Sequence, residues 1–222
     1  MKRLIPILSV LMILATMTTA MAKNMRYGRD RHGYDDGPGE TYGDSYVTVS
    51  LGAFMPEDDA YYLDNGISIG GALGHNLNPN FALEIGLDYT VADFKDEYGY
   101  YSYATDEYEH AYVTTLGIPV TARFIVPLSS RVDFFAGAGI GVYFMDVEIE
   151  DAYTDGYYHD EGVDDTRLGF HALMGADIEM NPHAALTMEL KYTELEGDSD
   201  DGYDDVLDFG GTTASVGVKF RF

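Results

Sequence analysis

The last stretch of the chain, residues 212–222, follows a strict alternation of side-chain types. One set is mainly apolar and ends in two aromatic rings: Thr212, Ala214, Val216, Val218, Phe220 and Phe222. The other set is small or charged: Thr213, Ser215, Gly217, Lys219 and Arg221. A period of two indicates a β-strand with two chemically different faces. The length matches the roughly 9–11 residues that a tilted strand needs to cross a bilayer. The stretch therefore predicts a membrane-crossing strand, and the prediction depends on finding partner strands.

Seven further segments of the chain alternate in the same way. They are residues 47–53, 67–74, 81–90, 115–124, 132–144, 168–179 and 186–193. With the last segment they make eight predicted strands. This is an even number, as bacterial single-chain membrane barrels require.

The face that points inward distinguishes a soluble barrel from a membrane barrel. A soluble eight-stranded barrel of the lipocalin kind has its apolar face inward and long, hydrated side chains outward. Here the polar face consists mostly of Gly, Ala, Ser and Thr, with a few isolated charges. Small residues suit an interior that is only wide enough for side chains, and an aliphatic face with Phe and Tyr near its ends suits lipid. We therefore predict an all-β fold, an eight-stranded antiparallel up-and-down transmembrane β-barrel.

The connections between the predicted strands alternate between short and long. The short ones, residues 75–80, 126–130 and 181–183, contain Pro or Asn-Pro as turn formers. The long ones are residues 55–65, 92–110, 145–167 and 194–208. Long loops on the outer side and tight turns on the periplasmic side are the rule in membrane barrels. Both chain ends are therefore expected on the periplasmic side.

Negative charge gathers in the long connections. The formal net charge is −25, and 27 of the 38 acidic residues lie in these four segments, against only Lys95 and Arg167. The same segments hold 11 of the 19 tyrosines. Nucleic-acid binding needs clustered Lys and Arg, so this charge argues against it. Such acidic runs are usually solvated loops. The alternative is an extracellular rim that binds divalent cations or presents Tyr to a partner.

The N-terminus has the features of a secretory signal. Lys2 and Arg3 precede an uncharged apolar stretch, and Ala20 and Ala22 fit the small-residue cleavage pattern. An uncleaved inner-membrane anchor is the weaker alternative, because the stretch is short for a hydrocarbon core of about 30 Å. We predict a cleaved signal peptide in residues 1–22, a flexible periplasmic segment in residues 23–44, and the barrel domain in residues 45–222. The chain has no Cys, which fits an exported protein that avoids disulfide chemistry.

The eight alternating segments, the long and short connections and the terminal Phe together resemble the small OmpA/OmpX-type outer-membrane barrels. The resemblance covers about residues 45–222. It implies a place in the outer membrane of a Gram-negative bacterium, in contact with its lipid and lipopolysaccharide. It also implies that Phe220 and Phe222 are the signal read by the barrel-assembly machinery. The chain has no Trp, so Tyr and Phe must supply any aromatic girdle. We expect a monomer.

The polar face also carries the charges that are expected to point into the lumen. They are Glu84, Asp88, Arg123, Asp133, Asp177, Glu179, Glu189, Lys191, Lys219 and Arg221, with His171 as a further member. A buried unpaired charge is costly, so these groups should pair across neighbouring strands. We predict an ion-pair network of Glu84, Asp88, Arg123, Glu189, Lys191 and Lys219.

Two pairings in this network are predicted from strand order. Glu84 should pair with Arg123, and Glu189 with Lys219 or Lys191. The network either fixes the register and closes the lumen or, as in members of the family that the chain resembles, gates a small ion current.

No catalytic residue, metal or cofactor is predicted. Outer-membrane lipases and deacylases need a nucleophile beside a base, commonly Ser and His reached from the lipid face, and the predicted lipid face has neither. The ligand spacing at residues 159–161 is not diagnostic of a metal site. The acidic run at residues 198–204 has its Gly one place too early for an EF-hand. Loose binding of divalent cations at the acidic loops stays open.

Three functions remain after these exclusions. The first is a non-enzymatic barrel that contributes to outer-membrane structure and contacts surfaces through acidic, Tyr-rich extracellular loops. The second is a narrow porin-like channel for ions or small solutes, in which Gly137, Gly139 and Gly141 leave unfilled space in the lumen. The third and weakest is a lipid-modifying enzyme.

Overall fold

The computed structural model describes residues 45–57, 62–95, 100–102, 107–109, 111–149, 153–154, 157–158, 163–195 and 210–222. The predicted signal peptide with Ala20 and Ala22, and the segment 23–44, lie outside the described residues and stay predictions. The described ranges include no helix that is long and apolar enough to cross a membrane.

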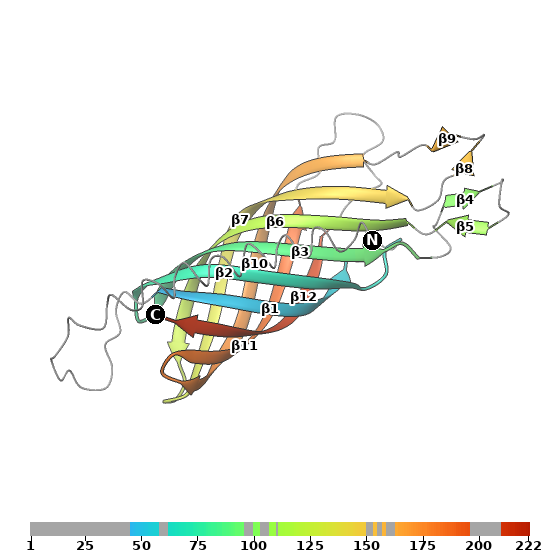
Figure 1. Cartoon of the computed structure of the whole chain (residues 1–222). Helices are drawn as coiled ribbons and strands as arrows, with labels where there is room; N and C mark the ends of the chain where they lie inside the picture. Colours follow the sequence, from blue (N-terminus) through green and yellow to red (C-terminus); the bar gives the residue numbers. More distant parts are fainter. Residues whose placement is uncertain are drawn as a thin grey trace.

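Eight antiparallel strands close into a barrel (Figure 1). Each pairs with the barrel strands before and after it in the sequence, and the first pairs with the last to close the cylinder. The barrel strands are β1 (Ser45–Pro56), β2 (Gly66–Asn78), β3 (Phe81–Asp93), β6 (Ala111–Pro127), β7 (Val132–Ile149), β10 (Val163–Asn181), β11 (Ala184–Leu195) and β12 (Gly211–Arg221). The predicted eight-stranded antiparallel barrel is confirmed.

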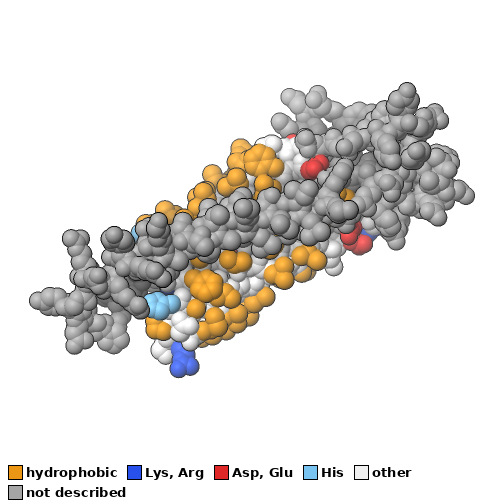
Figure 2. All heavy atoms as spheres, viewed as in Figure 1, with side chains coloured by type: hydrophobic (Ala, Val, Ile, Leu, Met, Phe, Trp, Pro, Cys, Tyr) orange, Lys and Arg blue, Asp and Glu red, His pale blue; other side chains and the backbone are white. Residues whose placement is uncertain are grey.

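The two faces of the barrel wall are chemically opposite, as the alternation predicts. Ile140 on β7 points outward with 60% of its surface exposed, whereas Arg123 on β6 points inward with 2% exposed. Every barrel strand exposes at least one large apolar side chain, such as Leu51, Ile67, Ile85, Val120, Phe170, Leu190 and Val216. Hydrophobic side chains accordingly cover much of the visible wall (Figure 2). The lipocalin-like alternative, with the apolar face inward, is excluded.

Two of the tight turns are built in the same way from an Asn-Pro pair. Oδ1 of Asn78 accepts a hydrogen bond of 2.9 Å from the backbone N–H of Asn80, and Oδ1 of Asn181 accepts one of 2.9 Å from that of His183. In each, an Asn side chain takes the place of a backbone acceptor, as in an Asx-turn. A register irregularity precedes each turn. We call this end of the barrel the turn end and the opposite end the loop end.

The strands are longer than the alternation predicts. β7 and β10 have 18 and 19 residues, and only Pro79 and Asn80 separate β2 from β3, where a six-residue connection was predicted. The ladder between β7 and β10 continues to the pair Val147 and Val163 at the loop end. Backbone pairing continues into water whichever side chains the strand carries, whereas the alternation marks only the part that faces lipid.

Two small hairpins lie beyond the loop end. β4 (Tyr100–Ser102) pairs with β5 (Glu107–Glu109), and β8 (Tyr153–Thr154) pairs with β9 (Tyr157–Tyr158). The C-terminus lies at the turn end, on the opposite side of the molecule (Figure 1). There the last strand is tied to the first, because the N–H of Phe222 donates to the carbonyl of Ser45 at 2.9 Å.

Candidate functional site in the barrel lumen

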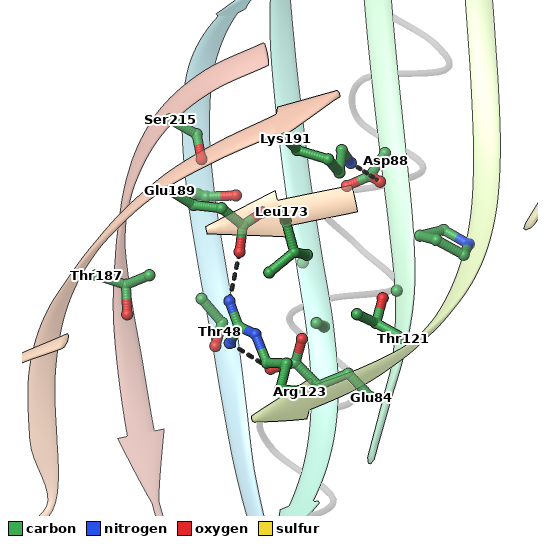
Figure 3. A pocket seen from close by; sticks show the side chains of 15 residues that line it. Thr48, Glu84, Asp88, Thr121, Arg123, Leu173, Thr187, Glu189, Lys191 and Ser215 are labelled. Atoms are coloured by element: carbon green, nitrogen blue, oxygen red, sulfur yellow. Dashed lines mark hydrogen bonds and ion pairs between the residues drawn. The ribbon is translucent and has the colours of Figure 1, made fainter. Parts of the chain in front are cut away.

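Arg123 is the centre of the charged lumen (Figure 3). Its Nη1 lies 2.6 Å from Oε1 of Glu84 on β3, and its Nη2 binds Oε2 of Glu189 on β11. Because β7 and β10 separate β6 from β11, this guanidinium spans the lumen. Its Cζ stacks on the ring of Phe135, 3.8 Å from the centroid, and the Tyr46 hydroxyl donates to Glu84 at 2.6 Å. The Arg123 guanidinium and its carboxylate partners are therefore held in place by side chains from several barrel strands.

Two further ion pairs flank Arg123. Nζ of Lys191 on β11 lies 2.5 Å from Oδ2 of Asp88 on β3, and these strands stand on opposite walls of the barrel. Nζ of Lys219 on β12 binds Asp177 on β10, which also accepts a hydrogen bond from the Thr187 hydroxyl. Each of these charges therefore has an oppositely charged partner, as a buried charge requires.

A looser group of charges lies at the rim of the turn end. Arg221 on β12 lies 3.2 Å from Glu179 and 3.7 Å from Asp133. These three side chains are partly exposed. Water can therefore share in their solvation, and the contacts are weaker than those at the centre.

The structure brings all six predicted network residues into the lumen, with partly different partners. Glu84 and Arg123 are in contact, as strand order predicted. The predicted pairing of Glu189 with Lys219 or Lys191 is wrong, because Glu189 binds Arg123. Lys191 binds Asp88, and Lys219 binds Asp177. The prediction assumed neighbouring strands, but in a lumen this narrow a long Arg or Lys side chain also reaches across to non-adjacent strands.

The lumen glycines do not leave empty space. A Cβ at Gly139 would lie 2.7 Å from the ring of His171, which hydrogen-bonds through Nε2 to the Thr121 hydroxyl at 2.8 Å. Gly137 and Gly141 are covered in the same way by Arg123 and by the ring of Tyr143. The expectation of unfilled space beside these three glycines is therefore wrong. Glycine here makes room for a large side chain, which comes from a neighbouring strand at Gly137 and Gly139 and from the same strand at Gly141.

A small cavity remains among the charged side chains. Its volume is about 50 Å³, and Glu84, Asp88, Arg123, Glu189 and Lys191 contribute to its lining (Figure 3). One water molecule needs roughly 10–15 Å³ of such volume. The cavity therefore has room for a few waters, far less than an open pore.

An apolar cluster closes part of the lumen at the loop end. Four of its members are inward side chains of barrel strands: Val113, Tyr143, Met145 and Leu195. Tyr62 and Leu63, from the connection between β1 and β2, pack onto them, with Phe94 at their edge. We call these seven residues the mouth cluster. The sequence pattern does not predict this cluster, because it places Tyr62 and Leu63 in a solvated acidic loop. Their apolar character within that loop was the available signal.

A Ser–His contact lies on the outer face of the barrel at the turn end, next to the segments that are predicted to face lipid. β1 and β2 extend far enough at the turn end to pair Ser45 with His75, and Oγ of Ser45 lies 3.1 Å from Nδ1 of His75. Both lie in register with the outward residues, but at the turn end and outside the segments 47–53 and 67–74 that are predicted to face lipid. In the described part of the chain, His75 has no carboxylate partner to orient it. The pair is therefore an incomplete nucleophile–base arrangement.

Among the residues that the structure describes, no group of three or more His, Asp or Glu side chains is placed to hold a metal ion. The acidic runs at residues 159–161 and 198–204 lie outside the described residues.

The family model described as "Outer membrane protein beta-barrel domain" matches residues 8–222. The chain belongs to this family. Membership places it in the outer membrane, so the loop end faces the outside and the turn end faces the periplasm. No curated protein matches the sequence.

Several solved structures are similar to the chain. Neisserial surface protein A has a TM-score of 0.52 at 16% identity, covering 81% of this chain and 97% of that one. OprG from Pseudomonas aeruginosa has a TM-score of 0.55 at 14% identity, with coverages of 84% and 99%. Ail, the attachment invasion locus protein of Yersinia pestis, has a TM-score of 0.50 at 13% identity, with coverages of 82% and 100%. At these identities the similarity shows the fold.

Proposed function

We propose that this protein is a non-enzymatic outer-membrane barrel that supports the membrane and contacts surfaces or ligands through its acidic, Tyr-rich extracellular loops. The filled lumen is the observation that carries this proposal. Arg123 and Lys191 each reach an acidic partner across the lumen, and the cavity between them is only about 50 Å³. A barrel filled in this way serves as a rigid support for what its loops present.

The loops supply the chemistry of the proposed contact. They hold 27 of the 38 acidic residues, and the barrel strands that they connect end at the loop end. Lipopolysaccharide is the expected neighbour in the outer leaflet, and divalent cations would bridge its phosphates to the loop carboxylates. At the loop end Tyr192 on β11 donates to the Glu57 carboxylate at 2.9 Å. Neisserial surface protein A and Ail are, by their names, surface and attachment proteins.

Planar-bilayer conductance tests the proposal against the channel alternative. We expect no steady conductance from the purified, folded protein, because ion pairs and rings fill the lumen. Steady, channel-like current from the parent protein would favour the porin-like function instead.

Terbium luminescence sensitised by Tyr tests the loops directly. Tb³⁺ is a luminescent stand-in for Ca²⁺, and we expect emission that Ca²⁺ suppresses by competition. The variant replaces Asp198, Asp200, Asp201, Asp204 and Asp205 by Asn, which removes charge and keeps size. It should lose much of the signal, whereas Asp133→Asn at the periplasmic rim should not. Equal emission from all three proteins would contradict a cation-binding rim.

Export and assembly are part of the same proposal. We infer cleavage after Ala22 and recognition of Phe220 and Phe222 by the barrel-assembly machinery. Intact-mass analysis of protein from the outer membrane should give a chain that begins at Lys23. Deleting Phe222 should lower the outer-membrane yield far more than it changes the folded barrel. Equal yield from parent and truncated chains would contradict the role of the terminal Phe.

A lipid-modifying activity is not part of the proposal. Ser45 and His75 are exposed to reagents at the periplasmic rim, so a fluorophosphonate probe can test them. We expect no labelling above that of Ser45→Ala, because His75 lacks an orienting carboxylate in the described part of the chain. Labelling that depends on both Ser45 and His75 would reopen the enzymatic function.

A further inference from the structure

Leu63 in the connection between β1 and β2 is nearly as buried as any side chain of the barrel interior. Its exposed fraction is 2% and that of its neighbour Tyr62 is 8%. Both belong to the mouth cluster, whose other buried members are the inward residues Val113 on β6, Tyr143 and Met145 on β7, and Leu195 on β11. A loop segment is therefore inserted into the extracellular opening of the lumen.

A short pairing with the end of β3 holds this segment. Leu63 and Phe94 form an isolated antiparallel bridge. The N–H of Asp64 donates to the carbonyl of Asp93 at 2.8 Å, and the N–H of Lys95 donates to that of Tyr62 at 2.9 Å. The rings of Tyr62 and Phe94 stack with centroids 5.6 Å apart. The contact is thus defined by backbone and side chains together.

The segment can lie against β3 because the next strand begins with glycine. A Cβ at Gly66 would lie 2.3 Å from the carbonyl oxygen of Val91 on β3. No real side chain fits at that distance. Asp64 and Asn65, which connect the bridge to Gly66, are exposed. A tight anchor and a solvated connector therefore flank the inserted residues on this side.

We propose that Tyr62–Leu63–Asp64 is a latch that seals the extracellular mouth, and that its release is the step that exposes the lumen. The lumen that it would seal holds the ion pairs of Asp88 with Lys191 and of Arg123 with Glu84. Moving Arg123 away from its partners would leave charges unpaired in a low-dielectric interior, which is very costly. Releasing the latch exposes two apolar side chains and two pairs of backbone groups to water that can solvate them. Opening is therefore easier at the latch than at the ion pairs.

The absence of Cys in the chain gives a clean background for testing the latch by thiol labelling. Thr193→Cys places one thiol on β11, facing inward and half-buried, two residues before Leu195 of the mouth cluster. The readout is its rate of modification by a cationic methanethiosulfonate reagent, followed by intact mass in the folded, purified protein.

Adding Leu63→Ser should accelerate this labelling on the order of tenfold, because labelling follows the population of the locally open state. The matched control is Leu128→Ser, at an exposed residue of a periplasmic turn, which should leave the rate unchanged. Equal rates in the parent and Leu63→Ser backgrounds would overturn the latch, and so would acceleration by Leu128→Ser.

A second experiment does not rely on a destabilising variant. Leu63 and Phe94 face each other across the bridge, so Leu63→Cys with Phe94→Cys should form a disulfide under mild oxidation. The control is Leu63→Cys with Leu128→Cys, whose positions lie at opposite ends of the barrel and should stay reduced within one chain. A folded double variant at 63 and 94 that does not cross-link would show that the mouth is not closed by this segment.

Discussion

The centre of the lumen and its extracellular mouth are closed by opposite chemistry. At the centre, Arg123 holds Glu84 and Glu189 from separate walls. At the mouth, Tyr62 and Leu63 close the lumen by apolar contact. The central side chains all come from strands, whose positions the barrel ladder fixes. The mouth depends on a loop segment whose backbone is held by one isolated β-bridge, made of two hydrogen bonds. A substitution at the centre therefore leaves a charge without a partner, whereas a substitution at the mouth gives water access to the lumen.

The largest effect is expected for Arg123→Ala. It leaves the buried carboxylate of Glu84 and the partly buried one of Glu189 without their cationic partner and should lower the free energy of unfolding by about 3–5 kcal/mol. Urea unfolding in lipid vesicles measures the loss. Lowering the pH should recover part of it, because protonation neutralises the unpaired carboxylates.

The control for Arg123→Ala removes all three charges at once. Glu84→Gln and Glu189→Gln combined with Arg123→Met should unfold much closer to the parent, since no charge is left unpaired. A triple variant as unstable as Arg123→Ala would mean that volume, and not charge, governs the centre.

The next effect is expected at the mouth, from Leu63→Ala. The loss should be about 2–3 kcal/mol, near the low end for a buried Leu, because water replaces the lost contact. Hydrogen exchange should accelerate at the amides of Asp64 and Lys95. Exchange in the strands around Arg123 should stay slow. The loss should not vary with pH as that of Arg123→Ala does. If hydrogen exchange accelerated equally in the strands around Arg123 and at the amides of Asp64 and Lys95, the centre and the mouth would be one cooperative unit.

Tyr46→Phe removes a single hydrogen bond from the central network. The hydroxyl donates to Glu84 at 2.6 Å, and the ring, over which Nζ of Lys219 lies 4.5 Å from the centroid, is kept. We expect a loss of about 1–2 kcal/mol, since the acceptor is charged. Urea unfolding measures it, with Tyr192→Phe at the exposed loop end as the matched control. No loss relative to that control would mean that Arg123 alone satisfies Glu84.

The smallest effect is expected at the periplasmic rim, from Arg221→Ala. Its contacts with Glu179 and Asp133 are partly exposed, so the loss should be at most about 1 kcal/mol. Added salt should reduce the difference between variant and parent, because exposed charges are screened. A loss in the free energy of unfolding as large as that of Arg123→Ala would mean that the rim contacts are as strong as the buried ion pairs at the centre.

The sequence predicted the pair that depends only on neighbouring strands. Glu84 and Arg123 stand at inward positions of β3 and β6, which follow each other among the barrel strands, so alternation and strand order suffice. Glu189 was assigned a wrong partner, because its actual partner comes from a strand that is not its neighbour. Alternation also missed the Ser45–His75 contact, since it marks the lipid-facing part of a strand and says little about where backbone pairing ends.

The chain's own alternation determined which side chains face lipid and which face the lumen. The reason is physical: a shift of one residue would turn every side chain of a strand to the opposite face. Closure of the barrel then decided what meets inside. Which side chains pair across the lumen depends on the distances between non-adjacent strands. The contact of Leu63 with Phe94 depends on a loop that folds back onto the closed barrel. Those distances exist only once β1 has paired with β12.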